Sequence, residues 1–121
     1  MPPLTEENQE ITPDLEEIFK EIKEKEFPRE AEIFKALGHP IRLKIVYGLL
    51  RVGGCNVKSM QACLGLHQAT VSQHLIHLKT RGIIESTRQG LEMIYKVTSP
   101  LAERIVSNLD DPDYKSDQGN E

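Results

Sequence analysis

The clearest pattern of apolar and polar positions lies in residues 64–79. Three apolar residues recur there with the spacing i, i+4 and i+7, which places them on one face of a helix: Val71, Leu75 and Leu78. This helix is predicted to begin near Gln68, and Gly65 before it is free to adopt the left-handed conformation that a tight turn between helices requires. Residues 64–79 therefore predict the turn and second helix of a helix-turn-helix.

The opposite face of this predicted helix is polar but carries no acid. Residues 67–80 contain no Asp or Glu, whereas an ordinary solvated helix face usually includes Glu. The polar face consists of these residues: Gln68, Thr70, Ser72, Gln73, His77 and Lys79. Short hydrogen-bonding side chains without acids suit the floor of the DNA major groove, where each base pair presents donors and acceptors. The pattern favours groove recognition over a merely solvated surface.

A second amphipathic pattern precedes this region. Thr12, Pro13 and Asp14 predict a helix start, because they supply a hydroxyl cap, a proline in the first turn and an acid near the positive helix end. An apolar stripe follows: Leu15, Ile18, Phe19 and Ile22. Pro28 is expected to kink or restart the helix, and a second segment covers residues 30–37. The stripe needs an apolar cover, which either its own domain or a second subunit can provide.

The rest of the chain predicts three more helices and a β-hairpin. The predicted elements are a helix that opens at His39 and Pro40 and stops at Gly53, a short helix that Asn56 or Ser59 can cap, strands over residues 83–87 and 91–97, and a last helix over residues 100–109. The apolar residues of the short helix are Val57, Met60, Cys63 and Leu64. Arg88, Gln89 and Gly90 are expected to form the hairpin tip. This order is that of a winged helix-turn-helix, a mostly α fold with a small β-hairpin.

The net charge of −4 conceals a basic body between two acidic ends. Residues 28–109 carry eleven Lys and Arg against five Glu, a local charge of +6. Contact with phosphate depends on local charge, so the acidic total does not exclude DNA as a partner. We expect an acidic, disordered N-terminus over residues 1–11, one domain over residues 12–109, and an acidic, disordered tail over residues 110–121.

Length and composition exclude several other classes of protein. A chain of 121 residues with 38% hydrophobic content allows one compact domain. No apolar run reaches membrane-spanning length, and the polar, acidic first ten residues do not form a signal peptide. Two cysteines are too few for a secreted disulfide framework, so we expect a cytoplasmic protein. No nucleophile–base pair, phosphate loop or carboxylate pair indicates an enzyme, and no cofactor is expected.

Three stretches in order resemble the ArsR/SmtB family of bacterial repressors: Leu37–Ile45 (LGHPIRLKI), Gln68–Leu75 (QATVSQHL), and Arg88–Gly90 (RQG) before a strand that bears a tyrosine. The resemblance spans about residues 30–109. It implies a homodimer that binds an imperfect palindrome in double-stranded DNA and pairs its subunits through the first and last helices, so that the N-terminal helix serves dimerisation. The implied dimer face consists of these residues: Leu15, Ile18, Ile22, Leu101, Ile105 and Leu109. The chain departs from the family at His67, where a serine N-cap is usual.

Within this fold, the second helix of the helix-turn-helix is expected to enter the major groove, and the hairpin is expected to reach the adjacent backbone or minor groove. The side chains expected to contact base edges and nearby phosphates are Gln68, Thr70, Ser72, Gln73 and His77. Those expected to contact mainly phosphate are Lys79, Arg81, Arg88 and Gln89.

No metal site is expected. Metal-sensing relatives use thiolates near the first helix of the helix-turn-helix, or Asp and His on the last helix. Cys55 falls near the first position, but no second cysteine lies two residues further on, and residues 100–109 contain no His or Cys. One thiol does not make a tetrahedral zinc site. The chain therefore resembles family members that have lost their metal sites.

Two alternatives remain open at this point. The first is a redox-responsive repressor that uses Cys55, expected to be exposed in a glycine-rich turn, and Cys63, expected to be buried. Along a helix their Cα atoms would lie roughly 12 Å apart, beyond the limit of about 7 Å for a disulfide, so free thiols are expected. The second alternative is a winged helix whose basic face binds protein and not DNA.

Overall fold

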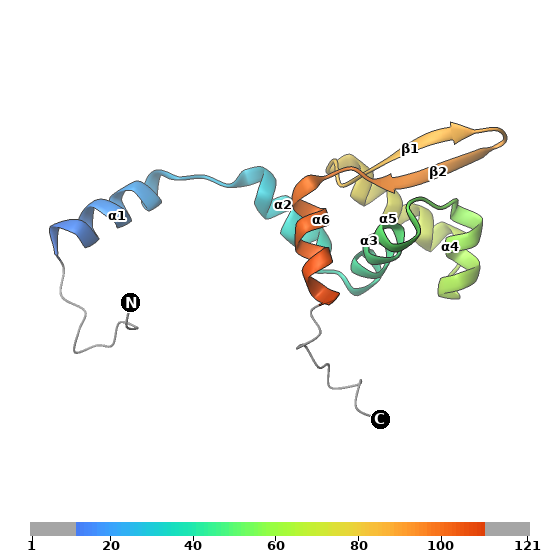
Figure 1. Ribbon diagram of the computed structural model, residues 1–121, viewed down its shortest axis with the longest axis horizontal. Coiled ribbons are helices and arrows are strands. Elements are labelled where there is room, and N and C mark those ends of the chain that lie inside the picture. Colours follow the sequence, from blue (N-terminus) through green and yellow to red (C-terminus); the bar gives the residue numbers. More distant parts are fainter. Residues whose placement is uncertain (1–11, 111–121) are drawn as a thin grey trace, which may run out of the picture.

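The structure, a computed structural model, describes residues 12–110 and places six α-helices and one β-hairpin in them (Figure 1). The elements are α1 (Pro13–Glu24), α2 (Pro28–Leu37), α3 (Pro40–Val52), α4 (Val57–Leu64), α5 (Gln68–Thr80), β1 (Ile84–Gln89), β2 (Glu92–Val97), α6 (Pro100–Ser107) and the 3₁₀ helix η2 (Asn108–Asp110). The predicted winged helix-turn-helix is confirmed. The acidic segments predicted at the two ends lie outside the described residues, apart from Asp110. None of the helices in residues 12–110 has the length and apolar character needed to cross a membrane.

Helix α3 lies at the centre of the fold and packs against α2, α5, α6 and β2. The apolar stripe predicted on α5 is buried in this core, because Val71, Leu75 and Leu78 are each at most 2% exposed. The other buried apolar residues come from α2, α3, α4 and α6 and from the start of the hairpin: Ala36, Leu37, Ile45, Val46, Leu49, Met60, Ile83, Ile84, Ala102 and Val106. The core therefore fixes α5 from its inner side only and leaves its outer side exposed.

The helix-turn-helix, α4 and α5, forms through local capping. The Asn56 side chain accepts a hydrogen bond of 2.7 Å from the Ser59 N–H and so caps α4. Gly65 ends α4 with a φ of 67°, the left-handed conformation expected for this turn. His67 begins α5 without a side-chain cap. The departure from the family serine therefore leaves the first turn of α5 without this stabilisation.

The β-hairpin forms the wing, and its tip differs from the prediction. Arg88 and Gln89 belong to β1, where they pair with Met93 and Glu92 of β2. The tip consists of Gly90 and Leu91 alone. Gly90 has a φ of 63°, and a two-residue hairpin loop with glycine at its first position needs no third residue. The strands therefore extend further from the body than predicted, and Arg88 lies along the wing instead of at its end.

Helix α1 stands clear of the other elements (Figure 1). Residues 25–27 separate it from α2. Pro28, which was expected to kink or restart the helix, therefore begins a new helix. On α1, Ile18, Phe19 and Ile22 are all more than half exposed. The sequence left two possible covers for this stripe, the chain's own domain and a second subunit. Within residues 12–110 the chain's own domain does not cover it. At the other end, α6 stops two residues earlier than predicted and Leu109 lies in η2.

The cysteine environments are the reverse of the prediction. Cys63 is exposed, whereas Cys55 is half-buried, and both thiols are free. On α4, the inner side is taken by Val57, Met60 and Leu64, and Cys63 lies about a quarter of a turn from the centre of that stripe. Cys55 is held because its backbone pairs with that of Tyr95 in β2, through hydrogen bonds of 3.1 and 2.9 Å.

Candidate nucleic-acid interface

The exposed side of α5 is the candidate surface for reading DNA. Gln73 lies opposite Val71 and Leu75 and is exposed. Gln68 is exposed as well, while Thr70 and Ser72, on the two flanks, are half-buried. Because no acidic residue lies in α5, no fixed negative charge on this helix opposes the approach of phosphate.

Two apolar residues share this exposed side, and the prediction from the sequence did not include them. Ala69 and Ile76 are exposed, with 65% of Ile76 accessible, and both lie on the same face as Gln73. The spacing i, i+4 and i+7 of residues 69, 73 and 76 places them on one face of the helix, and this signal is present in the sequence. In a major groove such side chains contact the thymine methyl group.

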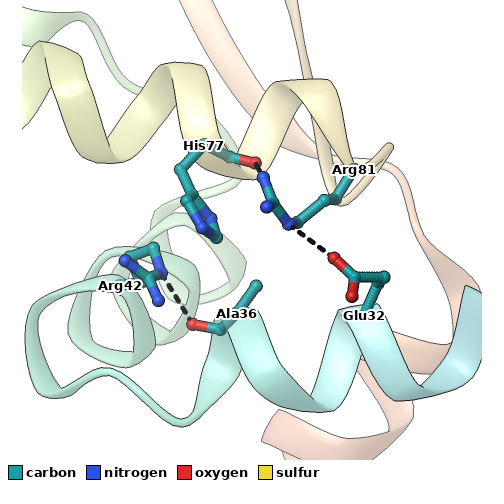
Figure 2. Close-up of polar contacts among 5 residues, drawn as sticks. All are labelled: Glu32, Ala36, Arg42, His77 and Arg81. Carbon is teal, nitrogen blue, oxygen red and sulfur yellow. Dashed lines mark hydrogen bonds and ion pairs between the residues drawn. The ribbon is translucent and has the colours of Figure 1, made fainter.

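His77 does not lie on the exposed side, contrary to the prediction. Its ring turns inward toward Arg42 of α3, and its Nδ1 is buried with no hydrogen-bond partner among the described residues (Figure 2). His74, His77 and Arg81 are spaced i, i+3 and i+7, so they form one flank of α5 that faces α3 and α2. On the same flank the His74 ring lies 4.6 Å from the ring of His39, centroid to centroid. The flank of α5 that carries His77 thus packs against the protein.

Arg81 connects the end of α5 to α2. Its Nε lies 3.2 Å from Oε1 of Glu32, and its Nη1 donates a hydrogen bond of 3.1 Å to the His77 carbonyl oxygen (Figure 2). Arg42 supports the same corner, because its Nε donates a hydrogen bond of 2.8 Å to the carbonyl oxygen of Ala36 at the end of α2. The Arg81 guanidinium is therefore engaged by the protein, which weakens its predicted role as a phosphate contact.

The charges in this corner favour neutral imidazoles. Burial lowers the pKa of His77 below its ordinary value, the cations Arg42 and Arg81 lower it further, and Glu32 opposes them. Burial, followed by the neighbouring His39 and Arg42, also lowers the pKa of His74. The folded protein therefore resists protonation on this flank of α5.

Hydrogen bonds join the wing to both helices of the helix-turn-helix. Lys79 on α5 donates a hydrogen bond of 2.7 Å from its Nζ to the Ser86 Oγ on β1. Asn56, at the start of α4, donates one of 2.9 Å from its Nδ2 to Oε1 of Glu92 on β2. Helix α5 and the wing are therefore positioned together as one surface.

Comparison with known proteins agrees with this arrangement. Residues 39–86 match the family described as "Bacterial regulatory protein, arsR family". The chain is 40% identical to the transcriptional repressor PagR of Bacillus anthracis over 80 residues, which are 66% of this chain and 80% of PagR. This chain belongs to the arsR family. A second relative of this arsR-family chain, the biofilm growth-associated repressor of Xylella fastidiosa, is 33% identical over 90 residues, covering 74% of this chain and 78% of the relative.

Solved structures carry the same fold as this arsR-family chain. The crystal structure of PagR superposes with a TM-score of 0.64 at 35% identity and covers 76% of this chain and 99% of PagR. A homodimeric winged helix-turn-helix DNA-binding domain from Mycobacterium bovis superposes with a TM-score of 0.60 at 27% identity, covering 68% of this chain and 75% of that domain.

In this arsR-family chain the predicted lack of a metal site stays a prediction. Within residues 12–110 no three His, Cys, Asp or Glu side chains come together in a way that suits a metal ion. His39, one of the four histidines, has a structural role, since its Nδ1 accepts a hydrogen bond of 3.1 Å from the Ile41 N–H at the start of α3.

The lowered pKa values of His74 and His77 predict that this arsR-family protein loses stability in mild acid. In the unfolded chain both histidines titrate near an ordinary pKa of about 6.5, so below that pH the unfolded chain binds more protons than the folded one. The two neutral histidines make their full contribution to the free energy of unfolding above pH 6.5, and this contribution is lost as the pH falls toward their lowered pKa values in the folded protein. Urea unfolding at pH 7.5 and pH 5.5 measures the effect, and the double variant His74→Gln His77→Gln should show a smaller difference between the two. An unchanged difference in that variant would contradict the assignment.

Proposed function

We propose that this arsR-family chain is a sequence-specific transcriptional repressor that binds an imperfect palindrome in DNA as a homodimer. The acid-free exposed side of α5, with Gln73 at its centre, carries the proposal. A helix of this kind in the second position of a helix-turn-helix enters the major groove in known complexes. The relative PagR is named a transcriptional repressor, which supports the direction of control.

The proposed contacts follow the exposure of each side chain. Base edges are assigned to these α5 residues: Gln68, Thr70, Ser72 and Gln73. Ile76 and Ala69 are assigned to thymine methyl groups. Phosphate is assigned to Lys79 and to Arg88 and Gln89 on the wing, all three of which are exposed. His77, predicted to contact bases, and Arg81, predicted to contact phosphate, are instead proposed to position α5, because the His77 ring is turned inward and Arg81 is paired with Glu32 of α2.

The proposed dimer face consists of apolar residues from α1, α6 and η2. Its α1 residues are Leu15, Ile18 and Ile22, and its C-terminal residues are Leu101, Ile105 and Leu109. Ile18, Ile22 and Leu109 are each about half exposed, so a large apolar area lacks a cover within residues 12–110. A second copy of the chain would bury this area, and the Mycobacterium bovis relative is described as homodimeric. The proposal involves no cofactor and no catalytic step, and for a bacterial regulator it places the chain in the cytoplasm.

Replacing Gln73 by alanine tests the readout. Glutamine pairs with adenine through two hydrogen bonds, so Gln73→Ala is expected to weaken binding to the operator by about 1–3 kcal/mol and to change binding to random duplex much less. Arg88→Ala is the comparison, since loss of a phosphate contact should weaken both complexes similarly and reduce the salt dependence by about one unit. Fluorescence anisotropy with a footprinted operator and a scrambled duplex measures both.

The same titrations separate the proposal from its alternative. Equal losses on both duplexes for Gln73→Ala would remove the base-reading role. Absence of any salt-dependent binding to duplex DNA by the unmodified protein would favour a winged helix that binds protein.

A further inference from the structure

A small apolar pocket lies between α3 and α4. Its volume is about 160 Å³. Buried side chains from both helices form its floor: Ile45, Leu49 and Met60. Val52, which is 67% exposed, and the exposed Cys63 stand at its rim. The described part of the chain thus leaves an apolar space open to solvent beside a helix of the DNA-binding motif.

A glycine keeps this pocket open. Gly48 lies in the middle of α3 and lines the pocket, and a Cβ built on it would meet no atom within 4 Å. Its backbone is helical, so no left-handed conformation requires glycine there. Glycine within a helix is less stable than alanine at the same position. Packing and backbone geometry therefore both allow a side chain at residue 48, and its absence creates the space.

The size and lining of the pocket define the ligand it would accept. An engineered apolar cavity of about 150 Å³ in another protein binds benzene, so the pocket has room for one six-membered ring or an aliphatic molecule of similar volume. Cys55 and Cys63 add polarisable sulfur to the apolar lining. We propose that this pocket binds a small uncharged apolar molecule of about that size.

A protein partner fits this site less well. Lys44, an exposed cation, is one of the residues that line the pocket. A protein partner whose apolar contact had the size that interfaces use would have to cover this cation, whereas a small molecule held among the apolar side chains would not.

The position of the pocket couples it to the DNA-binding surface. Helix α4 packs against α5, and Cys55, in the pocket lining, pairs through its backbone with Tyr95 of the wing. A ligand held between α3 and α4 fixes the separation of these two helices. Through the contacts just named, this separation determines the position of α5 and of the wing. Operator affinity changes to the extent that the ligand prefers one separation. This coupling rests on the proposed repressor function, whereas binding of the ligand does not.

Benzene is the probe for binding, and benzoate, which adds a carboxylate to the same ring, is the control for charge. At ten times its dissociation constant, benzene is expected to raise the Tm of the full chain by about 5 °C. In ¹H–¹⁵N spectra the shifts should concentrate at residues 45–64, and benzoate should produce neither effect. A Tm unchanged by benzene, with no localised shifts, would overturn the proposal.

Three variants test the site itself. Gly48→Leu should fill the pocket and weaken benzene binding at least tenfold, by analogy with other cavity-filling changes. Gly48→Ala should raise the Tm without ligand by a few degrees while reducing the benzene-induced rise, and these opposite effects remain readable if the leucine variant does not fold. Lys35→Leu, which adds the same side chain at an exposed position of α2, should bind benzene normally. Benzene binding unaffected in both Gly48 variants would place the ligand elsewhere and overturn the assignment.

Operator titrations with and without saturating benzene test the coupling. A change in operator affinity of about fivefold or more in the unmodified chain, absent in the Gly48 variants, is expected. Benzene binding without any change in operator affinity would overturn the coupling alone. Failure of the chain to bind the operator without benzene would instead count against the proposed repressor function and leave the ligand site standing.

Discussion

The double variant Ile18→Glu Ile22→Glu is expected to convert the proposed homodimer into monomers and to weaken operator binding by roughly 100-fold or more. Both side chains are about half exposed on α1, and no other described element covers them. Each of the two subunits would have to bury two carboxylates in the apolar interface, and burying an unpaired charge has a large desolvation cost. Without the dimer, each half of the palindrome is bound separately, and the gain from simultaneous binding disappears.

Sedimentation velocity at micromolar concentration measures the oligomeric state, and anisotropy measures operator binding. Lys23→Glu introduces the same side chain on α1 outside the apolar stripe, so that variant should remain dimeric and bind nearly as the unmodified protein does. A dimeric double variant with unchanged operator affinity would show that α1 is not part of the interface.

The variant Leu78→Ala is expected to lower the free energy of unfolding by about 2–5 kcal/mol. Leu78 is fully buried in the core on the inner side of α5. Its truncation removes apolar contacts and leaves a cavity that the surrounding helices fill only in part. For a domain of this size such a loss is a large fraction of the total stability.

Urea titration followed by circular dichroism measures this loss. The matched control is Ile76→Ala on the same helix, where the side chain is 65% exposed, and its effect on stability should be within about 0.5 kcal/mol. Equal losses from both variants would mean that Leu78 is not a core residue.

The fold could be predicted from the sequence because its local signals agree with one another. The stripe on α5, the proline and glycine positions around α3, and the alternation in the hairpin all point to the same order of elements. The exact extent of the wing could not be predicted in this way. The sequence suggested a tip of three residues, and the pairing of Gln89 with Glu92 leaves only two. Such a register depends on cross-strand pairs, which sequence periodicity does not determine.

The candidate site was predicted less completely than the fold. Gln73 could be assigned to the exposed face because it lies opposite a regular apolar stripe. His77 was predicted to lie on the exposed face because it is polar. Its actual position is set by the packing of α5 against α3 and α2, which decides which flank of the helix is covered. The same limit applies to Cys63, whose apolar character suggested burial although Met60 and Leu64 already fill the inner side of α4. A residue type indicates what a side chain can tolerate, and the neighbouring elements decide where it lies.

The isolation of α1 has a consequence for gene dosage. Residues 25–27 alone link α1 to the remainder of the described chain, its apolar face has no cover within residues 12–110, and a partner chain would provide one. In the proposed homodimer that partner is another copy, so the amount of active species depends on abundance by mass action. While monomers predominate, the concentration of dimer rises with the square of the concentration of chain. Occupancy of an operator would then respond more steeply to synthesis of the protein than it would for a monomeric regulator, which makes expression level itself an input to control.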